Sequence, residues 1–397
     1  MMKMKRTMAL LVAVLLIAGM LAGCNGGNGG GGGGDVDEVT IGMLAPLTGP
    51  VAQFGVAVYQ GANLYIEQFN ARGGLQINPI ILDEEGDPIL AVTMYHNLVD
   101  QGVTAILGSV TSGPTMAVVP LAYEDNMPMI TATATHANVT INAETNEVFT
   151  NMFRSCFIDP FQGQKMAEFA VEVLGAQTAA VLYSNEIDYS IGLKEAFYSR
   201  AGELGLEIVQ VETFPDEAID YRSQLTNIAA MSPDVLFIPA YYRHIGLIGP
   251  QSQEVGLEGT TLLGADGWAT ITDFMGAEAS AINGSFFLTG FSPDAEEPRI
   301  QEFITNYQAR WGEMPNMFAA QAYDAAMILI AAIEETLANT DYEPGSDAFR
   351  TALIANMAAT DLTGVTGHVT YDEFNNPQKS AIVLEVIDGQ ETYWGEF

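Results

Sequence analysis

A regular alternation of strand-like and helix-like segments begins at Glu38 and limits the folds that this chain can adopt. Short runs of alternating or continuous apolar residues predict strands, and longer runs with apolar residues at helical spacing predict helices. The predicted strands are 39–43, 79–82, 103–107 and 128–132, and the predicted helices are 51–71, 88–100 and 113–124. Strands that alternate with helices favour parallel sheets covered by helices.

The same alternation restarts after Arg154. The predicted helices there are 160–174, 190–204, 220–230 and 243–255, and the predicted strands are 179–183, 206–211, 234–239 and 260–264. The tail differs, with helices near 298–311, 317–338 and 346–357 before strands near 366–371 and 380–387. We therefore predict an α/β fold with two doubly wound parallel-sheet lobes and a ligand cleft beyond the carboxyl ends of their strands.

The N-terminal segment has a different composition from the body. Three basic residues precede an uncharged run from Thr7 to Gly23, which predicts a secretory signal peptide over residues 1–23. The sequence Leu21-Ala22-Gly23-Cys24 matches a bacterial lipobox, so Cys24 is predicted to be lipidated; the alternative is an uncleaved membrane anchor. Residues 24–37 would then be a lipidated cysteine and a glycine-rich linker. This arrangement predicts an extracytoplasmic body tethered to a membrane by lipid.

The charge balance excludes one class of partner. The chain has 49 acidic and 14 basic residues, and its net charge is −35. Nucleic-acid binding depends on Lys and Arg that neutralise phosphates, so we predict no nucleic-acid partner. Two explanations of the acidity stay open, namely compositional bias and adaptation to saline or acidic surroundings.

Motifs for catalysis and metal binding are absent from the sequence. It contains no GxxxxGK[ST], HExxH, CxxC or GxSxG, and its four histidines are scattered. Two cysteines cannot form a disulfide framework or a four-cysteine zinc site, and Cys156 is predicted to be a buried structural thiol. We predict that the chain is not an enzyme and has no cofactor and no metal site.

Two polar segments follow predicted strands of the first half. In Ile106–Thr115 a strand leads into a helix that Ser112 could cap, and the free amides of such a helix start favour an anion such as a carboxylate. Thr131–Thr135 offers hydroxyls and backbone carbonyls at the end of the next strand. Each segment alone is also compatible with an ordinary loop or helix start.

Several segments together resemble the leucine/isoleucine/valine-binding proteins, which are type I periplasmic binding proteins of branched-chain amino-acid ABC importers. The resemblance runs from about Val39 to the C-terminus. The matching segments are Gly42–Pro50 with Gly55 and Gly61, Asn70–Gly74, Ile106–Thr115, Met129–Thr135, Arg154 with Asp159 and Gln162-Gly163, and Val369–Asp372.

The resemblance implies a ligand site for a zwitterion. Ser112 and Thr135 would hold the carboxylate, and the Thr133 carbonyl, the Thr135 hydroxyl and Asp266 would hold the ammonium. A relative has glutamate at the position of Asp266, so the side chain here is one methylene shorter. The implied aromatic walls are Phe54, Tyr189, Tyr241, Trp268 and Phe318, with Tyr242 as the alternative to Tyr241. Both charges of a buried amino acid need partners, because desolvation costs several kcal/mol per ion.

The resemblance also implies an architecture and partners. Lobe I would comprise residues 38–159 and 291–368, and lobe II residues 160–290 and 369–397, joined by a three-segment hinge. A monomer would capture its ligand by hinge closure and deliver it to a membrane permease served by a separate ATPase. The alternative is a sensor module of the same fold that binds amides, urea or aromatic acids. An extracellular enzyme is disfavoured, because the sequence lacks a nucleophile–base pair.

Overall fold

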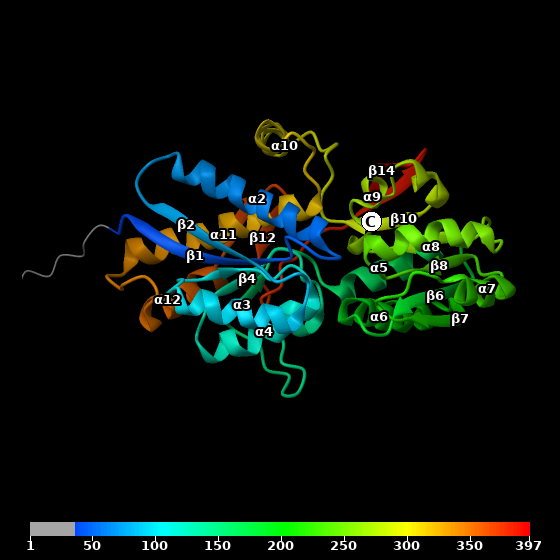
Figure 1. Cartoon of the computed structure of the whole chain (residues 1–397), viewed down its shortest axis with the longest axis horizontal. Coiled ribbons are helices and arrows are strands. Elements are labelled where there is room, and N and C mark those ends of the chain that lie inside the picture. Colours follow the sequence, from blue (N-terminus) through cyan, green and yellow to red (C-terminus); the bar gives the residue numbers. More distant parts are fainter. Residues whose placement is uncertain (1–35) are drawn as a thin grey trace, which may run out of the picture. The chain divides into compact units, whose positions relative to one another are not determined.

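Two separate β-sheets with helices packed against them organise the described residues, 36–397 (Figure 1). The computed structural model has five strands in the first sheet and seven in the second, and a two-stranded hairpin forms a small third sheet. The predicted signal peptide, the lipidated Cys24 and nearly all of the linker lie outside the described residues.

The first sheet has the strand order β2-β1-β3-β4-β5, and every neighbouring pair is parallel. Its strands are β1 (Glu38–Ala45), β2 (Gln76–Asp83), β3 (Ile106–Leu107), β4 (Met129–Thr131) and β5 (Met152–Arg154). The helices between them are α2 (Ala52–Asn70), α3 (Pro88–Asp100) and α4 (Ser112–Glu124), with a short 3₁₀ turn at Ala137–Val139. Helical crossovers put the carboxyl ends of parallel strands at one edge, so the loops after β1, β3 and β4 gather there.

The second sheet has the order β14-β13-β10-β9-β8-β6-β7. Its strands are β6 (Thr178–Ser184), β7 (Glu207–Phe214), β8 (Val235–Phe237), β9 (Thr261–Gly264), β10 (Phe286–Thr289), β13 (Ile382–Ile387) and β14 (Gln390–Glu396). Its helices are α5 (Asp159–Glu172), α6 (Asp188–Leu204), α7 (Arg222–Met231), α8 (Tyr242–Glu254) and α9 (Ile271–Met275), with 3₁₀ turns at Asp266–Trp268 and Gly276–Ile282. The neighbouring strands β7, β6, β8, β9 and β10 are parallel to one another. Strand β13 is antiparallel to β10, and β14 is antiparallel to β13.

The chain passes between the two sheets three times, between β5 and α5, after β10, and between β12 and β13. The returning segment carries α10 (Pro298–Trp311), α11 (Met317–Asn339), α12 (Asp347–Ala358), β11 (Asp361–Gly364) and β12 (Gly367–Thr370). Among the described helices, α11 alone is long and apolar enough to cross a membrane, and 78% of its most apolar stretch is buried. It packs along α2 and is the core helix of the part of the molecule built on the first sheet.

The predicted α/β alternation is confirmed, and each of the predicted helices is present close to its expected bounds. Strands β5, β10, β11 and β14 were not predicted from the sequence, and β3 is shorter than predicted. A three-residue strand such as β5 is too short to show periodicity, and β14 has no buried face to produce one. The antiparallel edge is a second difference. Asp388 and Gly389, both with positive φ, connect β13 to β14, and a two-residue connection permits only an antiparallel hairpin.

Candidate functional site

A small cavity, here called the central cavity, lies where the strand-end loops of both sheets meet. The residues that line it are Phe54, Val110, Thr111, Ser112, Thr133, Thr135, Tyr189, Tyr241, Asp266, Gly267 and Phe318. The structure therefore brings together every predicted ligand residue except Trp268.

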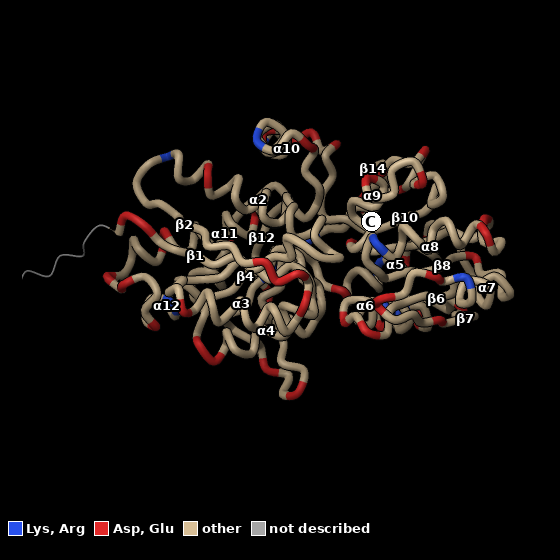
Figure 2. Tube along the Cα trace, in the orientation of Figure 1, with Lys and Arg blue, Asp and Glu red and all other residues tan. Residues whose placement is uncertain are grey.

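Basic side chains take no part in this lining. Acidic residues are spread along the described chain and basic ones are few (Figure 2), and the lining contains neither Lys nor Arg. A carboxylate in the central cavity would therefore depend on hydroxyls and on backbone amides. Such amides are available at the start of a helix.

The amino end of α4 supplies this kind of anion site. Thr111 is the N-cap residue, no side chain caps the helix, and both Thr111 and Ser112 line the central cavity. The expectation that Ser112 caps α4 is wrong: its Oγ instead accepts a hydrogen bond from the N–H of His136 at 3.2 Å. The first-turn amides of α4 thus keep their donor capacity for an anion.

The loop after β4 contributes two threonines with different environments. The Thr133 hydroxyl donates to the Val110 carbonyl at 2.7 Å, which ties this loop to the loop after β3. The Thr135 hydroxyl is buried and has no hydrogen bond of ordinary geometry among the described residues. An unpaired buried hydroxyl costs free energy, so Thr135 favours an occupant that bonds to it.

Asp266 faces the central cavity from the second half of the chain. It is 2% exposed and begins the 3₁₀ turn after β9. Its Oδ1 accepts from the Tyr189 hydroxyl at 2.7 Å and from the Gln162 Nε2 at 3.0 Å. The Gln162 Oε1 accepts from the Asp266 amide at 2.9 Å, and the Tyr189 oxygen accepts from the Gly267 amide at 2.7 Å. The carboxyl is thus held in place through Oδ1, and no side chain among the described residues donates a hydrogen bond to Oδ2.

Burial dominates the electrostatics of Asp266. Desolvation raises the pKa of its carboxyl to about 6, although the hydrogen bonds from Tyr189 and Gln162 oppose that rise. The carboxylate therefore lacks compensating charge at neutral pH, and a cation next to Oδ2 would supply it. Gln162 was assigned no role from the sequence. A glutamine that pairs with an acid 104 positions away leaves no local signal.

Aromatic rings form the remaining walls. Tyr189 stacks on Tyr241 with ring centroids 4.9 Å apart, and Phe54 stacks on Phe318 at 4.2 Å. Tyr241 also meets Phe54 edge-on at 5.6 Å, which links the two stacks across the central cavity. The neighbouring Tyr242 is not part of the lining. Its ring packs edge-on against Phe54, and its hydroxyl donates to the Pro50 carbonyl.

Trp268 lies in the core of the part of the molecule built on the second sheet, so the prediction that it forms a cavity wall is wrong. Its side chain is fully buried, and its Nε1 donates to the Ile238 carbonyl at 2.9 Å. The indole lies directly over Gly264, where an added Cβ would come within 2.3 Å of the ring. The 3₁₀ turn that presents Asp266 to the central cavity carries the side chain two positions later into this core.

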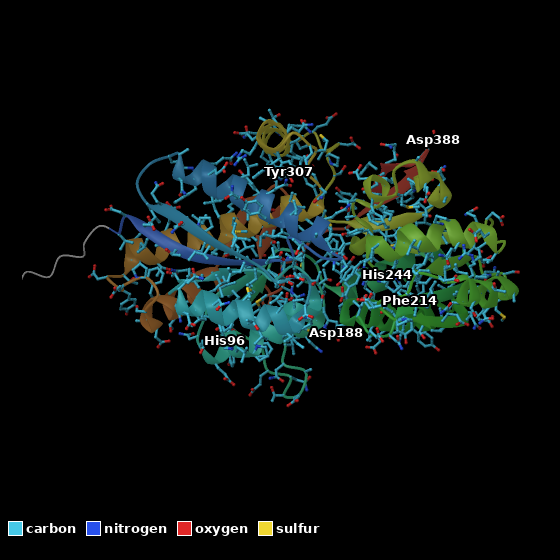
Figure 3. All side chains as sticks on the ribbon, viewed as in Figure 1. His96, Asp188, Phe214, His244, Tyr307 and Asp388 are labelled. Atoms are coloured by element: carbon cyan, nitrogen blue, oxygen red, sulfur yellow. The ribbon has the colours of Figure 1, made fainter. Side chains whose placement is uncertain are left out.

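The remaining candidate groups serve as packing or hydrogen-bonding residues. Cys156 is buried, and desolvation raises the pKa of its thiol to about 12. His244 is buried beside Phe214 (Figure 3) and bonds to the Tyr221 hydroxyl at 2.8 Å and to Asp216 at 3.3 Å. Across the described residues, no group of His, Cys, Asp and Glu has an arrangement that could hold a metal ion.

Comparisons with known proteins identify the family of this chain. The family model described as periplasmic binding protein matches residues 38–391, and the chain belongs to that family. The Leu/Ile/Val-binding protein homolog 3 of Brucella melitensis is 27% identical over 343 residues, which cover 85% of this chain and 90% of the relative. The resemblance inferred from the sequence is therefore confirmed, and family members are solute-binding proteins found outside the cytoplasm.

Two solved structures show the same fold. A branched-chain amino-acid transporter substrate-binding protein from Streptococcus pneumoniae, in complex with isoleucine, is 27% identical with a TM-score of 0.80, and the match covers 90% of this chain and 99% of that one. An ABC-transporter solute-binding protein from Rhodopseudomonas palustris, in complex with benzoate, is 23% identical with a TM-score of 0.79 and coverage of 90% and 96%. The fold class is thus that of the type I periplasmic binding proteins, and it accepts ligands of more than one chemical class.

Proposed function

We propose that this protein binds an α-amino acid with a branched or other apolar side chain and delivers it to an ABC importer. The observation that carries the proposal is the position of Asp266 in the cavity lining: its Oδ1 is fixed by Tyr189 and Gln162, and its Oδ2 has no side-chain donor among the described residues. The uncapped amino end of α4 lines the same small cavity. An acid and an anion site in one cavity match the two charges of a zwitterion.

The charge of the cavity lining favours an amino acid over an aromatic acid. A ligand such as the benzoate of the Rhodopseudomonas palustris protein brings a negative charge and no positive one. Beside the buried Asp266 that ligand would leave two like charges in a lining without Lys or Arg. The ammonium of an amino acid neutralises Asp266 instead. Sensing of amides, urea or aromatic acids is the second candidate, and the benzoate complex of the same fold favours the aromatic acids among these.

The rest of the proposal concerns architecture and location. Residues 38–159 with 291–368, and 160–290 with 369–397, would act as two lobes that close on the ligand as a monomer. Cys24 would carry a lipid that holds the protein at the outer side of a membrane, where a permease and its ATPase take up the ligand. The protein itself would catalyse no reaction.

A thermal-shift screen of the full-length protein in mild detergent tests this function. Leucine, isoleucine or valine at 100 times its dissociation constant is expected to stabilise the folded state by about 2.7 kcal/mol. For a body of this size the unfolding temperature rises by a few degrees. The panel also contains the other amino acids, urea, short amides and benzoate. A shift with benzoate or amides alone would contradict the amino-acid assignment and favour the sensor alternative.

The affinity for leucine is expected to fall about tenfold per pH unit below pH 6. The cause is protonation of Asp266, whose pKa is about 6 in the ligand-free protein, because a neutral carboxyl no longer pairs with the ammonium. Isothermal titration at pH 5, 6, 7 and 8 measures this dependence. An affinity that is the same at pH 5 and pH 7 would exclude Asp266 as the ammonium partner.

A further inference from the structure

Asp159 is a buried acid to which the sequence assigned no role, and it is not among the residues that line the central cavity. It begins α5, where an acid suits the helix dipole, and its backbone N–H donates to the Thr135 carbonyl at 2.9 Å. The side chain is fully buried, and neither carboxyl oxygen has a hydrogen bond of ordinary geometry among the described residues. Leaving such a group unpaired is expensive, so an acid kept here calls for a partner.

The polar group beside this carboxyl is the Thr135 hydroxyl, which partly offsets the rise that burial causes in the pKa of Asp159. That hydroxyl lines the central cavity and is itself without a hydrogen bond of ordinary geometry. Asp159 thus lies behind Thr135 as seen from the cavity. On its other side Oδ2 faces Gly192 of α6, one turn beyond Tyr189, at 3.3 Å from where a Cβ would stand.

The nearby basic groups do not satisfy Asp159. Arg154 directs its guanidinium to the carbonyls of Ala134 and His136 and to the Thr140 hydroxyl, at 3.0 to 3.2 Å. Burial lowers the pKa of His136, whose ring also contacts Gly192, so His136 is neutral at neutral pH. The other titratable groups around Asp159 are Asp266, Tyr189, Tyr241 and Cys156.

We infer that Asp159 is a positioning residue of the ligand site: it accepts the Thr135 O–H, so that the Thr135 oxygen turns its lone pairs toward the ligand's ammonium. A hydroxyl has one donor and two acceptor positions, and giving the donor to Asp159 leaves Thr135 as an acceptor only. The ammonium then contacts Asp266 on one side and, on the other, the Thr135 oxygen, whose hydrogen is held by Asp159. The inference rests on the proposed function and deepens it, because such a site selects ligands with an ammonium over the same ligands without one.

Asp159→Asn tests the inference when two ligands are compared. The probes are leucine and 4-methylpentanoate, which is leucine without its amino group. In the full-length protein, the substitution is expected to weaken leucine about 10- to 100-fold, the range for a lost hydrogen bond involving a charged group. The affinity for 4-methylpentanoate is expected to stay the same, because that ligand has no ammonium to contact the Thr135 oxygen. A merely structural defect would weaken both ligands equally, and that result would overturn the inference.

A double-mutant cycle separates action through Thr135 from other effects. In a Thr135→Val background, Asp159→Asn is expected to change the leucine affinity less than about threefold, because no hydroxyl remains to be oriented. Asp324→Asn is the matched control: Asp324 is equally buried but accepts from the amides of Val365 and Thr366 and lies outside the cavity lining. It should leave the ratio of the two affinities unchanged.

The outcomes distinguish the two proposals. A wild-type protein that binds leucine, with Asp159→Asn binding it equally well, overturns the role of Asp159 alone. A wild-type protein that binds benzoate or 4-methylpentanoate but no amino acid overturns both the proposed function and this role. If Asp159→Asn selectively lowers the affinity for leucine, and does not do so in the Thr135→Val background, the result supports both the proposed function and the role of Asp159.

Discussion

Asp266→Asn is expected to lower the affinity for leucine about 100-fold or more and, in the ligand-free protein, to raise the unfolding temperature by a few degrees. The asparagine oxygen can still accept from Tyr189 and Gln162, so the local structure is kept. Its amide NH₂, however, replaces the oxygen that has no side-chain donor among the described residues, and a donor now faces the ammonium. Removing one partner of a buried charge pair costs about 2–5 kcal/mol.

The gain in stability follows from the pKa of Asp266. Burial raises that pKa from 3.8 to about 6, so the folded state binds the proton more tightly than the unfolded state does. The stability cost of ionising Asp266 is absent below pH 4, develops between pH 4 and pH 6, and is complete above pH 6. At pH 7 it amounts to about 3 kcal/mol, which asparagine removes. Loss of binding together with a rise in stability cannot result from general damage to the fold.

Titration calorimetry and thermal unfolding on the same preparations measure both effects. Asp100→Asn is a suitable control, because Asp100 is an exposed acid at the end of α3 and outside the cavity lining. It should change neither quantity appreciably. An Asp266→Asn protein that binds leucine as tightly as the wild type would refute the assignment of Asp266, and with it the zwitterion site.

The sequence predicts the positions of the site residues because one topological rule governs them. Ser112, Thr135 and Tyr241 lie far apart in the chain, but each follows a parallel strand within a few residues, and within each sheet the parallel strands end at one edge. Periodicity locates those strand ends well enough to identify the loops. The family resemblance then selects positions within the loops.

What could not be predicted depends on side-chain direction and on pairs distant in sequence. Asp266 and Trp268 are two positions apart, yet the 3₁₀ turn directs one into the central cavity and the other into the core. Gln162 supports Asp266, and Asp159 lies behind Thr135, through contacts between positions that are distant in sequence and that exist only in the folded chain. Sequence spacing carries no information about such contacts unless the turn type is already known.

Gly61→Ala is expected to destabilise the protein by about 1–3 kcal/mol, although alanine is a better helix former than glycine. Gly61 lies in the middle of α2, and a Cβ there would come within 2.0 Å of the Ala319 carbonyl oxygen of α11. Both atoms belong to rigid helices, so the helices must move apart. Phe54 lies two turns before Gly61 and Phe318 directly before Ala319, so the close approach also fixes the Phe54–Phe318 stack of the central cavity. The variant should therefore lose ligand affinity as well.

Gly202→Ala provides the matched comparison for this effect. Gly202 lies in α6, is exposed, and has no neighbouring atom within 4 Å of an added Cβ. There the substitution reduces the entropy of the unfolded chain without a steric penalty, and a gain of about 0.5–1 kcal/mol is expected with unchanged affinity. Denaturant unfolding of both variants gives the two free-energy changes. Free-energy changes of opposite sign would show that the close α2–α11 contact requires glycine at position 61. Equal gains in stability would mean that the two helices approach each other less closely than in the structure, and that the Phe54–Phe318 stack does not depend on this contact.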